Sequence, residues 1–211
     1  MLDREFHEYI YADGQLQRAE VSYRLPNGEL IGKKSIDYTR SLHVPTFLTE
    51  LYEGRFVEGL RYEGDKAVMF RRKGEKGKEK SKTIQTQSAM VADAGFNNYV
   101  TSKFAELMRG ETVSFKFVAP TQLAAIQFDA RKIGDRTLDT GMPVTDFKVE
   151  ISSFLSWFVD PLTLSYDPET QNLIEYRGVS NVRDADGELY KVRIRYPQLI
   201  RTSDEIAQTK P

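Results

Sequence analysis

Apolar and polar residues alternate with a period of two over much of the chain. The clearest alternations cover residues 19–25, 113–117, 124–130, 162–166 and 190–196. In the last of these, Tyr190, Val192, Ile194 and Tyr196 alternate with Lys191, Arg193 and Arg195. This pattern predicts β-strands with one packed face and one face in water.

Turn-forming dipeptides separate these segments. They are Asp13-Gly14, Asn27-Gly28, Gly64-Asp65, Asp167-Pro168 and Asp186-Gly187. Asp-Gly and Asn-Gly suit tight hairpins because their backbones readily adopt a positive φ. We count about a dozen strands with mostly short connections, which predicts an antiparallel meander.

Two segments follow a helical period instead. The first has apolar residues at Phe96, Tyr99, Val100, Phe104, Leu107 and Met108, with Asp93 as a candidate N-cap and Gly110 as a stop. The second has Ile151, Phe154, Leu155 and Phe158 and ends at Asp160-Pro161. Each predicted helix has one apolar face, so we expect both to pack on the sheet.

The two helices are too short to cover a flat sheet of this size. A dozen strands spaced by about 4.8 Å span on the order of 55–60 Å, whereas the helices span roughly 21 and 14 Å. Sheets with this many strands usually curl or split. The expected fold is mainly β (α+β): a large curved antiparallel meander sheet forming a half-barrel or barrel, with two short helices on its concave face. We expect one domain over residues 1–202, including a basic loop at 71–82, and a polar flexible tail at 203–211.

One stretch near the end of this layout is similar to the closing strands of bacterial envelope proteins. It comprises Leu164-Ser165-Tyr166-Asp167 and, further on, Leu173-Ile174-Glu175-Tyr176-Arg177-Gly178. The whole arrangement of strands and helices resembles the Lol-type periplasmic lipoprotein carriers and their outer-membrane receptors. The resemblance is one of architecture and transfers no residue roles. It implies an envelope protein that binds a lipid or acyl chain in its concave face.

The compartment follows from how the N-terminus is interpreted. Residues 1–7 contain no apolar stretch that would serve as a signal peptide. A leader removed from the mature chain predicts the periplasm or cell envelope, and a chain without one predicts the cytoplasm.

Composition narrows the possible chemistry. The chain has no cysteine, which excludes disulfides, zinc–thiolate sites and cysteine nucleophiles, and it has only two histidines. Its net charge of −1 gives no general attraction to nucleic acid. No phosphate-binding glycine loop, serine nucleophile elbow or HExxH motif is present. We therefore expect no cofactor, no metal, no nucleic-acid partner and no enzymatic activity.

Aromatic residues are the candidates for a ligand site. We expect Phe115, Phe117, Phe128, Phe154, Trp157 and Phe158 to line an apolar pocket. Trp157, the only tryptophan, lies off the apolar stripe of its predicted helix. The alternative is that 151–158 is a core helix with one extra apolar residue.

A basic run lies at residues 71–82, with seven positive and two negative side chains. Its candidate contact residues for a partner or an anionic membrane surface are Arg71, Arg72, Lys73, Lys76, Lys78 and Lys80. The alternative is a solvated hairpin loop between strands that end near Phe70 and begin near Thr83. The run contains no aromatic residues, which argues against nucleic-acid binding.

The remaining titratable residues form no recognisable catalytic set. His7 is expected on the wet face of a strand and His43 in a loop. Residues 184–188 superficially resemble a calcium loop but lack its later ligands, and a hairpin turn explains them. Asp129, Asp135, Asp139 and Asp146 are scattered around a loop, and their spacing alone does not pair them as acid and base.

Two functions are favoured, beside a third, a hydrolase that uses the scattered acidic residues, which would require a cluster of buried carboxylates in a cleft. The first is a non-enzymatic binding protein that holds a lipid or another apolar ligand in the concave face of its sheet. The second is a structural or interaction module with a fully packed core that contacts a partner through its surface or its basic loop. A pocket in the interior favours the first, and a filled interior favours the second.

Overall fold

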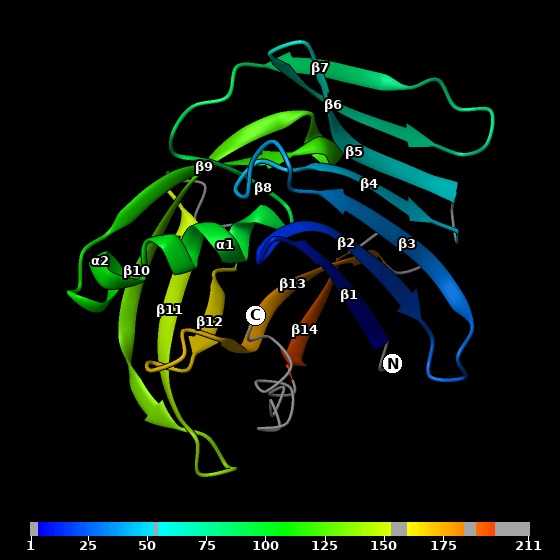
Figure 1. The fold of residues 1–211 in the computed structure, drawn as a ribbon. Coiled ribbons are helices and arrows are strands. Elements are labelled where there is room, and N and C mark those ends of the chain that lie inside the picture. The colour runs from blue at the N-terminus through cyan, green and yellow to red at the C-terminus, as the bar shows by residue number, and fades with distance from the viewer. Residues whose placement is uncertain (1–3, 53–54, 153–159, 184–188, 197–211) are drawn as a thin grey trace.

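The computed structural model describes residues 4–52, 55–152, 160–183 and 189–196, whose strands form two seven-stranded sheets (Figure 1). The first sheet contains β1 (Arg4–Ala12), β2 (Gln15–Arg24), β3 (Leu30–Asp37), β4 (Thr46–Leu51), β5 (Phe56–Glu63), β6 (Lys66–Lys73) and β7 (Lys80–Ile84). The second contains β8 (Met90–Ala92), β9 (Val113–Ala119), β10 (Ala124–Thr137), β11 (Pro143–Ile151), β12 (Leu162–Tyr166), β13 (Leu173–Arg183) and β14 (Leu189–Arg195).

Neighbouring strands in the chain are neighbours in each sheet. The first sheet runs in the order β1 to β7 with antiparallel pairing throughout. The second runs from β14 to β8, and only its β8–β9 pair is parallel. Asp13 and Gly14 both have positive φ in the β1–β2 turn, as the sequence predicts for a tight hairpin.

The helices lie between β8 and β9. They are α1 (Gly95–Ser102) and α2 (Phe104–Met108), which Figure 1 shows end to end across the inner face of the second sheet. The sequence predicts one continuous helix here, but the backbone at Lys103 leaves the helical region and divides it. The predicted N-cap is also wrong. Ala94 occupies the N-cap position, and the Asp93 carboxylate pairs with Lys34 instead.

Each sheet has its own core. The first is built from inward residues of β2 to β6, among them Val21, Phe47 and Leu60. The second packs α1 and α2 against β9 to β12. Strand β8 serves both, because Met90 and Ala92 join the first core while Val91, between them in sequence, joins the second.

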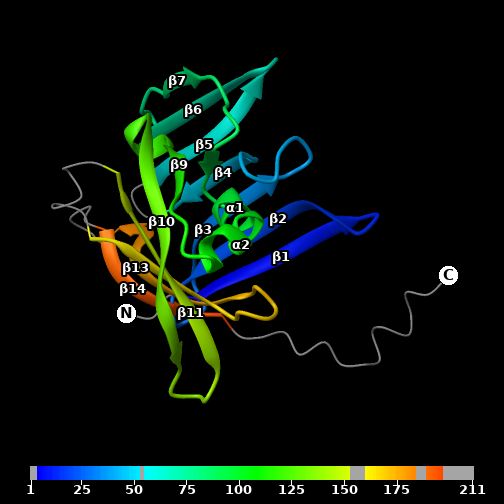
Figure 2. The ribbon, with the colours of Figure 1, turned by 90° about the vertical axis from the view of Figure 1, so that its left-hand side faces the viewer.

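The expected fold class is confirmed: the chain is mainly β, largely antiparallel and curved, with few helices (Figure 2). The strands are divided between two sheets, however, and do not belong to one. Among the described strands no ladder joins the sheets, so they do not form a closed barrel. The division arises because β8 pairs with β9 and not with β7, so the meander stops and restarts there.

The second predicted helix is mostly outside the described residues, because it falls on 153–159. Its first residue, Ile151, is the last residue of β11, so the helix does not begin there. The predicted turn at 184–188 also lies outside the described part of the chain.

Candidate functional site

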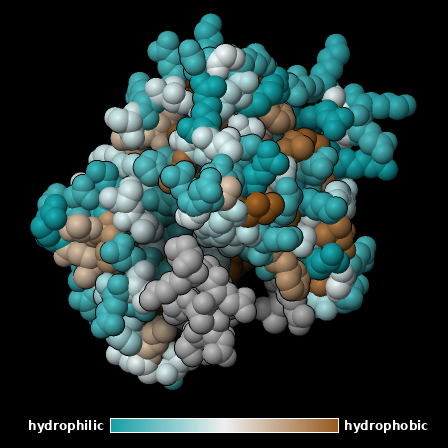
Figure 3. Space-filling view, viewed as in Figure 1, coloured by the Kyte–Doolittle hydropathy of each residue, from teal (hydrophilic) through white to brown (hydrophobic). Residues whose placement is uncertain are grey.

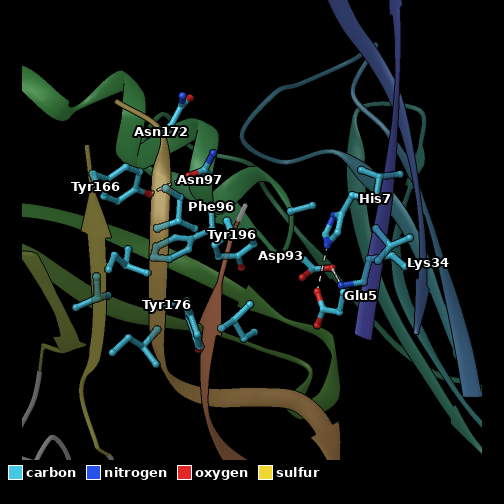
Figure 4. Close-up of a pocket in the computed structure, with 18 of the residues that line it drawn as sticks. Glu5, His7, Lys34, Asp93, Phe96, Asn97, Tyr166, Asn172, Tyr176 and Tyr196 are labelled. Carbon is cyan, nitrogen blue, oxygen red and sulfur yellow. Dashed lines mark hydrogen bonds and ion pairs between the residues drawn. The ribbon is translucent and has the colours of Figure 1, made fainter. Parts of the chain in front are cut away.

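A cavity of about 990 Å³ lies between the two sheets. Its walls come from β1, β2 and β3 on one side and from α1 and β9 to β14 on the other. Figure 4 shows this arrangement, with Glu5, His7 and Lys34 facing Tyr176 and Tyr196 across the space.

Aromatic rings dominate the lining. Seven tyrosines and four phenylalanines contribute to it: Tyr9, Tyr11, Tyr23, Tyr38, Tyr166, Tyr176, Tyr196, Phe96, Phe115, Phe117 and Phe128. Phe115 and Phe128 stack across β9 and β10 with ring centroids 6.0 Å apart, and Phe117 meets Phe128 edge-on at 6.1 Å. Such packed rings give the second sheet a rigid apolar wall.

Three of the residues expected to line a pocket, Phe115, Phe117 and Phe128, lie on this wall. The other three, Phe154, Trp157 and Phe158, lie outside the described residues. The first three residues therefore lie at the cavity, and the role of the other three stays a prediction.

The opposite wall carries a buried ion pair. Lys34 Nζ lies 2.5 Å from Asp93 Oδ2, and the two side chains are 6% and 18% exposed. The ammonium also lies over the Tyr23 ring at 5.9 Å. Burial favours the neutral amine, but Asp93 and Tyr23 outweigh it and raise the pKa of Lys34 above its ordinary value. Lys34 is therefore protonated at neutral pH.

A second polar group lies on β1. His7 Nε2 is 3.2 Å from Glu5 Oε2, and Tyr9 Oη is 3.5 Å from His7 Nδ1. His7 is exposed, as the sequence predicts, and together with Glu5, Tyr9 and Tyr11 it also lines the cavity. Strand β1 has apolar residues on both faces, so its alternation does not indicate which face turns inward.

The tyrosine hydroxyls supply neutral hydrogen-bonding groups. Tyr166 Oη donates to Asn97 Oδ1 on α1 at 2.9 Å, and Tyr176 Oη donates to the Val179 carbonyl at 2.6 Å. Burial raises the pKa of Tyr23 and of Tyr176 to about 12. These phenols therefore stay protonated at neutral pH and add polarity without charge.

The outer face of the second sheet carries a network of arginines around a buried carboxylate. The Glu175 side chain is 0% exposed, with Oε2 2.7 Å from Arg193 Nε and Oε1 3.1 Å from Arg136 Nη2. Arg177 and Arg195 approach it at 3.3 Å. Successive residues of a strand point to opposite faces. Tyr176 lines the cavity, so Glu175, its neighbour on β13, and the arginines around it face away from the cavity.

The four aspartates considered as acid–base candidates are held in polar contacts of this outer face and its surroundings. Asp146 pairs with Arg136 at 2.7 Å, Asp139 with Arg195 at 3.0 Å, and Asp135 with Lys132 at 2.9 Å. Asp129 accepts a hydrogen bond from Ser114 at 2.6 Å. None of the four lines the cavity.

The basic run is a hairpin and not one loop. Arg71, Arg72 and Lys73 belong to β6 and Lys80 to β7, so only Lys76 and Lys78 of the predicted contact residues lie in the connection. The sequence predicts that the strands end near Phe70 and begin again near Thr83. They extend further into the charged run than this, because Arg71 and Lys80 pair across the ladder. Hydrophilic residues cover this region at the top of Figure 3. The hairpin lies at the opposite edge of the first sheet from β1 and thus away from the cavity wall.

His43 lies between β3 and β4, as expected, with its ring edge-on to Tyr99 at 5.3 Å. Burial and the nearby Lys103 lower its pKa. Within the described residues, no three His, Cys, Asp or Glu side chains are placed to hold a metal ion. None of the described helices is long and apolar enough to cross a membrane.

Sequence reasoning missed the tyrosines of the cavity and the Lys34–Asp93 pair. A signal for the tyrosines exists: Tyr23, Tyr166 and Tyr196 occupy inward positions of alternating strands, where an aliphatic residue would fill a closed core more simply. Lys34 and Asp93 are far apart in sequence and give no local signal.

Comparison of the sequence with protein-family models and with curated proteins gives no match, and the search of solved structures gives none either.

Proposed function

We propose that this protein binds a lipid or another largely apolar molecule in the cavity between its two sheets. The observation that carries the proposal is the cavity itself. Its volume of about 990 Å³ is at the upper end of the range for small-molecule sites, roughly 300–1,000 Å³. A module with a fully packed core would leave no such space.

The lining supports an apolar occupant. Phe117, Phe128, Leu162 and Ile194 present apolar surface to the cavity from four strands of the second sheet. Burial of an acyl chain against such a wall contributes about 0.8 kcal/mol per methylene. The stacked phenylalanines hold the wall in place, so little ordering is needed when the ligand binds.

A role in the bacterial envelope belongs to the same proposal and rests on the resemblance to Lol-type carriers. Native mass spectrometry of the protein purified from its own host, without delipidation, tests whether it carries a lipid, and fractionation of host cells into periplasm, membranes and cytoplasm tests the envelope role. We expect a mass excess that dissociates as one small amphiphile.

A cavity-filling variant tests the location of the site. Leu162 faces the cavity, whereas Thr163, next to it on β12, pairs with Arg177 on the outer face. We expect the neutral fluorophore phenylnaphthylamine to bind the parent protein in a saturable manner. Leu162→Trp should weaken that binding by roughly tenfold or more, because the indole occupies ligand space.

Thr163→Trp is the matched control and should bind the fluorophore like the parent. Near-ultraviolet circular dichroism verifies that both variants are folded. Absence of saturable binding to the parent, or equal binding to a folded Leu162→Trp variant, would contradict the proposal.

A further inference from the structure

The charged groups of the cavity all lie at the side of the first sheet. They are Glu5 and His7 on β1, Lys34 on β3, and Asp93 before α1. Among the described lining residues, strands β9 to β14 and their connections contribute tyrosine hydroxyls and other neutral polar groups but no charged side chain. A molecule that fills the cavity therefore meets charge at one end and apolar rings along its body, which favours an amphiphile.

The charged group of the cavity that lacks a permanently charged partner is a carboxylate, so its charge is negative. Among the described residues, Lys34 is the one amine in the lining, and it lies 2.5 Å from Asp93. An anionic headgroup would have to displace Asp93 to reach it. The second carboxylate, Glu5, has no such cation: among the described residues its only ion-pair partner is His7, at 3.2 Å.

The contacts of Glu5 are to His7 and its surroundings. His7 Nε2 lies 3.2 Å from Glu5 Oε2, and Tyr9 Oη lies 3.5 Å from His7 Nδ1. An imidazole, unlike an ammonium or a guanidinium, is not permanently charged. Among the described residues, Glu5 therefore has no fixed counter-charge comparable to the one that Lys34 gives Asp93, and its side chain is 28% exposed.

Tyrosines from both sheets surround this carboxylate. Tyr9 and Tyr23 lie on its own sheet, and Tyr176 and Tyr196 face it from the other (Figure 4). Their pKa values are raised, first by burial and then in part by the negative charge of Glu5, so all four lie within its electrostatic reach. A carboxylate beside several aromatic side chains is an environment that attracts a cation.

We propose that the cavity selects an amphiphile with a positively charged headgroup, an alkylamine or a quaternary ammonium, whose charge lies beside Glu5 among the tyrosines. Its tail lies along the apolar wall of β9 to β14. This inference rests on the proposed function and adds the class of headgroup.

Three amphiphiles with the same tail test it: decyltrimethylammonium, decyl maltoside and decanoate, each below its micelle concentration, by isothermal titration calorimetry at low salt. We expect the cation to bind best and the anion worst, with at least roughly a tenfold difference between them. Glu5→Gln should weaken binding of the cation by about tenfold and leave binding of the maltoside unchanged.

Glu8→Gln is the matched control. Glu8 lies on the same strand with its side chain on the opposite face, so this variant loses the same charge outside the cavity. It should retain the preference for the cation.

The two proposals fail in different ways. If decanoate binds as tightly as the cation, or if Glu5→Gln affects all three amphiphiles equally, the headgroup inference is overturned while ligand binding stands. If none of the three binds the parent protein, the proposed function itself is wrong.

Discussion

Lys34 and Asp93 connect the two sheets, because their ion pair joins β3 of the first sheet to the residue that follows β8 of the second. Asp93 adopts a positive φ of 36°. Aspartate and asparagine tolerate this backbone conformation better than most residues. The pair is therefore both an electrostatic link and part of the turn that starts α1.

Asp93→Asn should destabilise the protein by about 3–5 kcal/mol, because it leaves the Lys34 ammonium buried without its counter-charge. Asparagine keeps the backbone conformation, so the loss reports the charge. Urea denaturation measures it. Combining Asp93→Asn with Lys34→Met should recover much of the lost free energy, since no buried charge then remains.

The exposed pair Arg109–Glu111 provides the control, and Glu111→Gln should have only a small fraction of that effect. A cost for Asp93→Asn as small as that of the control would show that the buried pair does not hold the sheets together.

The buried Glu175 carboxylate makes the free energy of unfolding depend on pH in the acidic range. Burial opposes its charge, but Arg193 and Arg195 outweigh burial and hold its pKa below the ordinary value. Its contribution is therefore present above the unfolded-state pKa of about 4.3 and is lost as the pH falls through the lower folded-state pKa. The free energy of unfolding of the parent should decrease over that acidic window.

Glu175→Gln should remove this part of the pH dependence and lower stability at neutral pH by about 1–3 kcal/mol, because it weakens the charge-assisted hydrogen bonds to four arginines that are themselves 32–52% exposed and can turn to water. Chemical denaturation at a series of pH values measures both effects. Asp139→Asn, at the exposed end of the network, should change stability less. Parallel pH profiles for the parent and Glu175→Gln would refute the assignment.

Gly95 allows α1 to approach the backbone of the β3–β4 connection. A Cβ at this position would lie 2.1 Å from the His43 carbonyl oxygen, so Gly95→Ala requires the helix to move. We expect a loss of about 1–3 kcal/mol or more in thermal or urea unfolding. Gly178→Ala is the comparison, because its Cβ would meet the end of the Leu162 side chain at 2.4 Å, which can rotate away. A smaller cost there would show that backbone contact, and not crowding in general, determines the effect.

The basic hairpin is predicted to contact anionic membranes. Lys76 and Lys78 are exposed in the connection between β6 and β7, and each basic residue near such a surface contributes about 1 kcal/mol. Changing both to glutamine should reduce sedimentation with vesicles of anionic lipid by about tenfold or more. The control changes the exposed Lys33 and Lys116 to glutamine, which removes the same charge elsewhere. Equal losses in the two variants would argue against a specific role for the hairpin.

The sequence predicts local features well where one face of an element is clearly apolar. The strand that contains Val21 and Tyr23 and the hairpin at Asp13-Gly14 follow directly from alternation and turn chemistry. The pattern does not predict that the strands divide into two sheets, because that depends on β8 pairing with β9 across the helices.

The candidate site was predictable only in part. Phe115, Phe117 and Phe128 lie on inward strand positions that alternation identifies. The polar half of the cavity could not be predicted, because Lys34 and Asp93 are far apart in the sequence and meet only in the folded structure. Arg193 and Arg195 likewise appear in the sequence as a wet face, although they cover a fully buried Glu175 from another strand.

The chain-order pairing within each sheet has a consequence for biosynthesis. Every strand of the first sheet pairs with its neighbour in the chain, so this half needs no distant loop closure and can assemble as it leaves the ribosome. Its inner wall, including Tyr23 and Lys34, then remains in contact with water until residues 90–196 are made. That interval is when the nascent chain is most exposed to aggregation and when a chaperone would have most to protect.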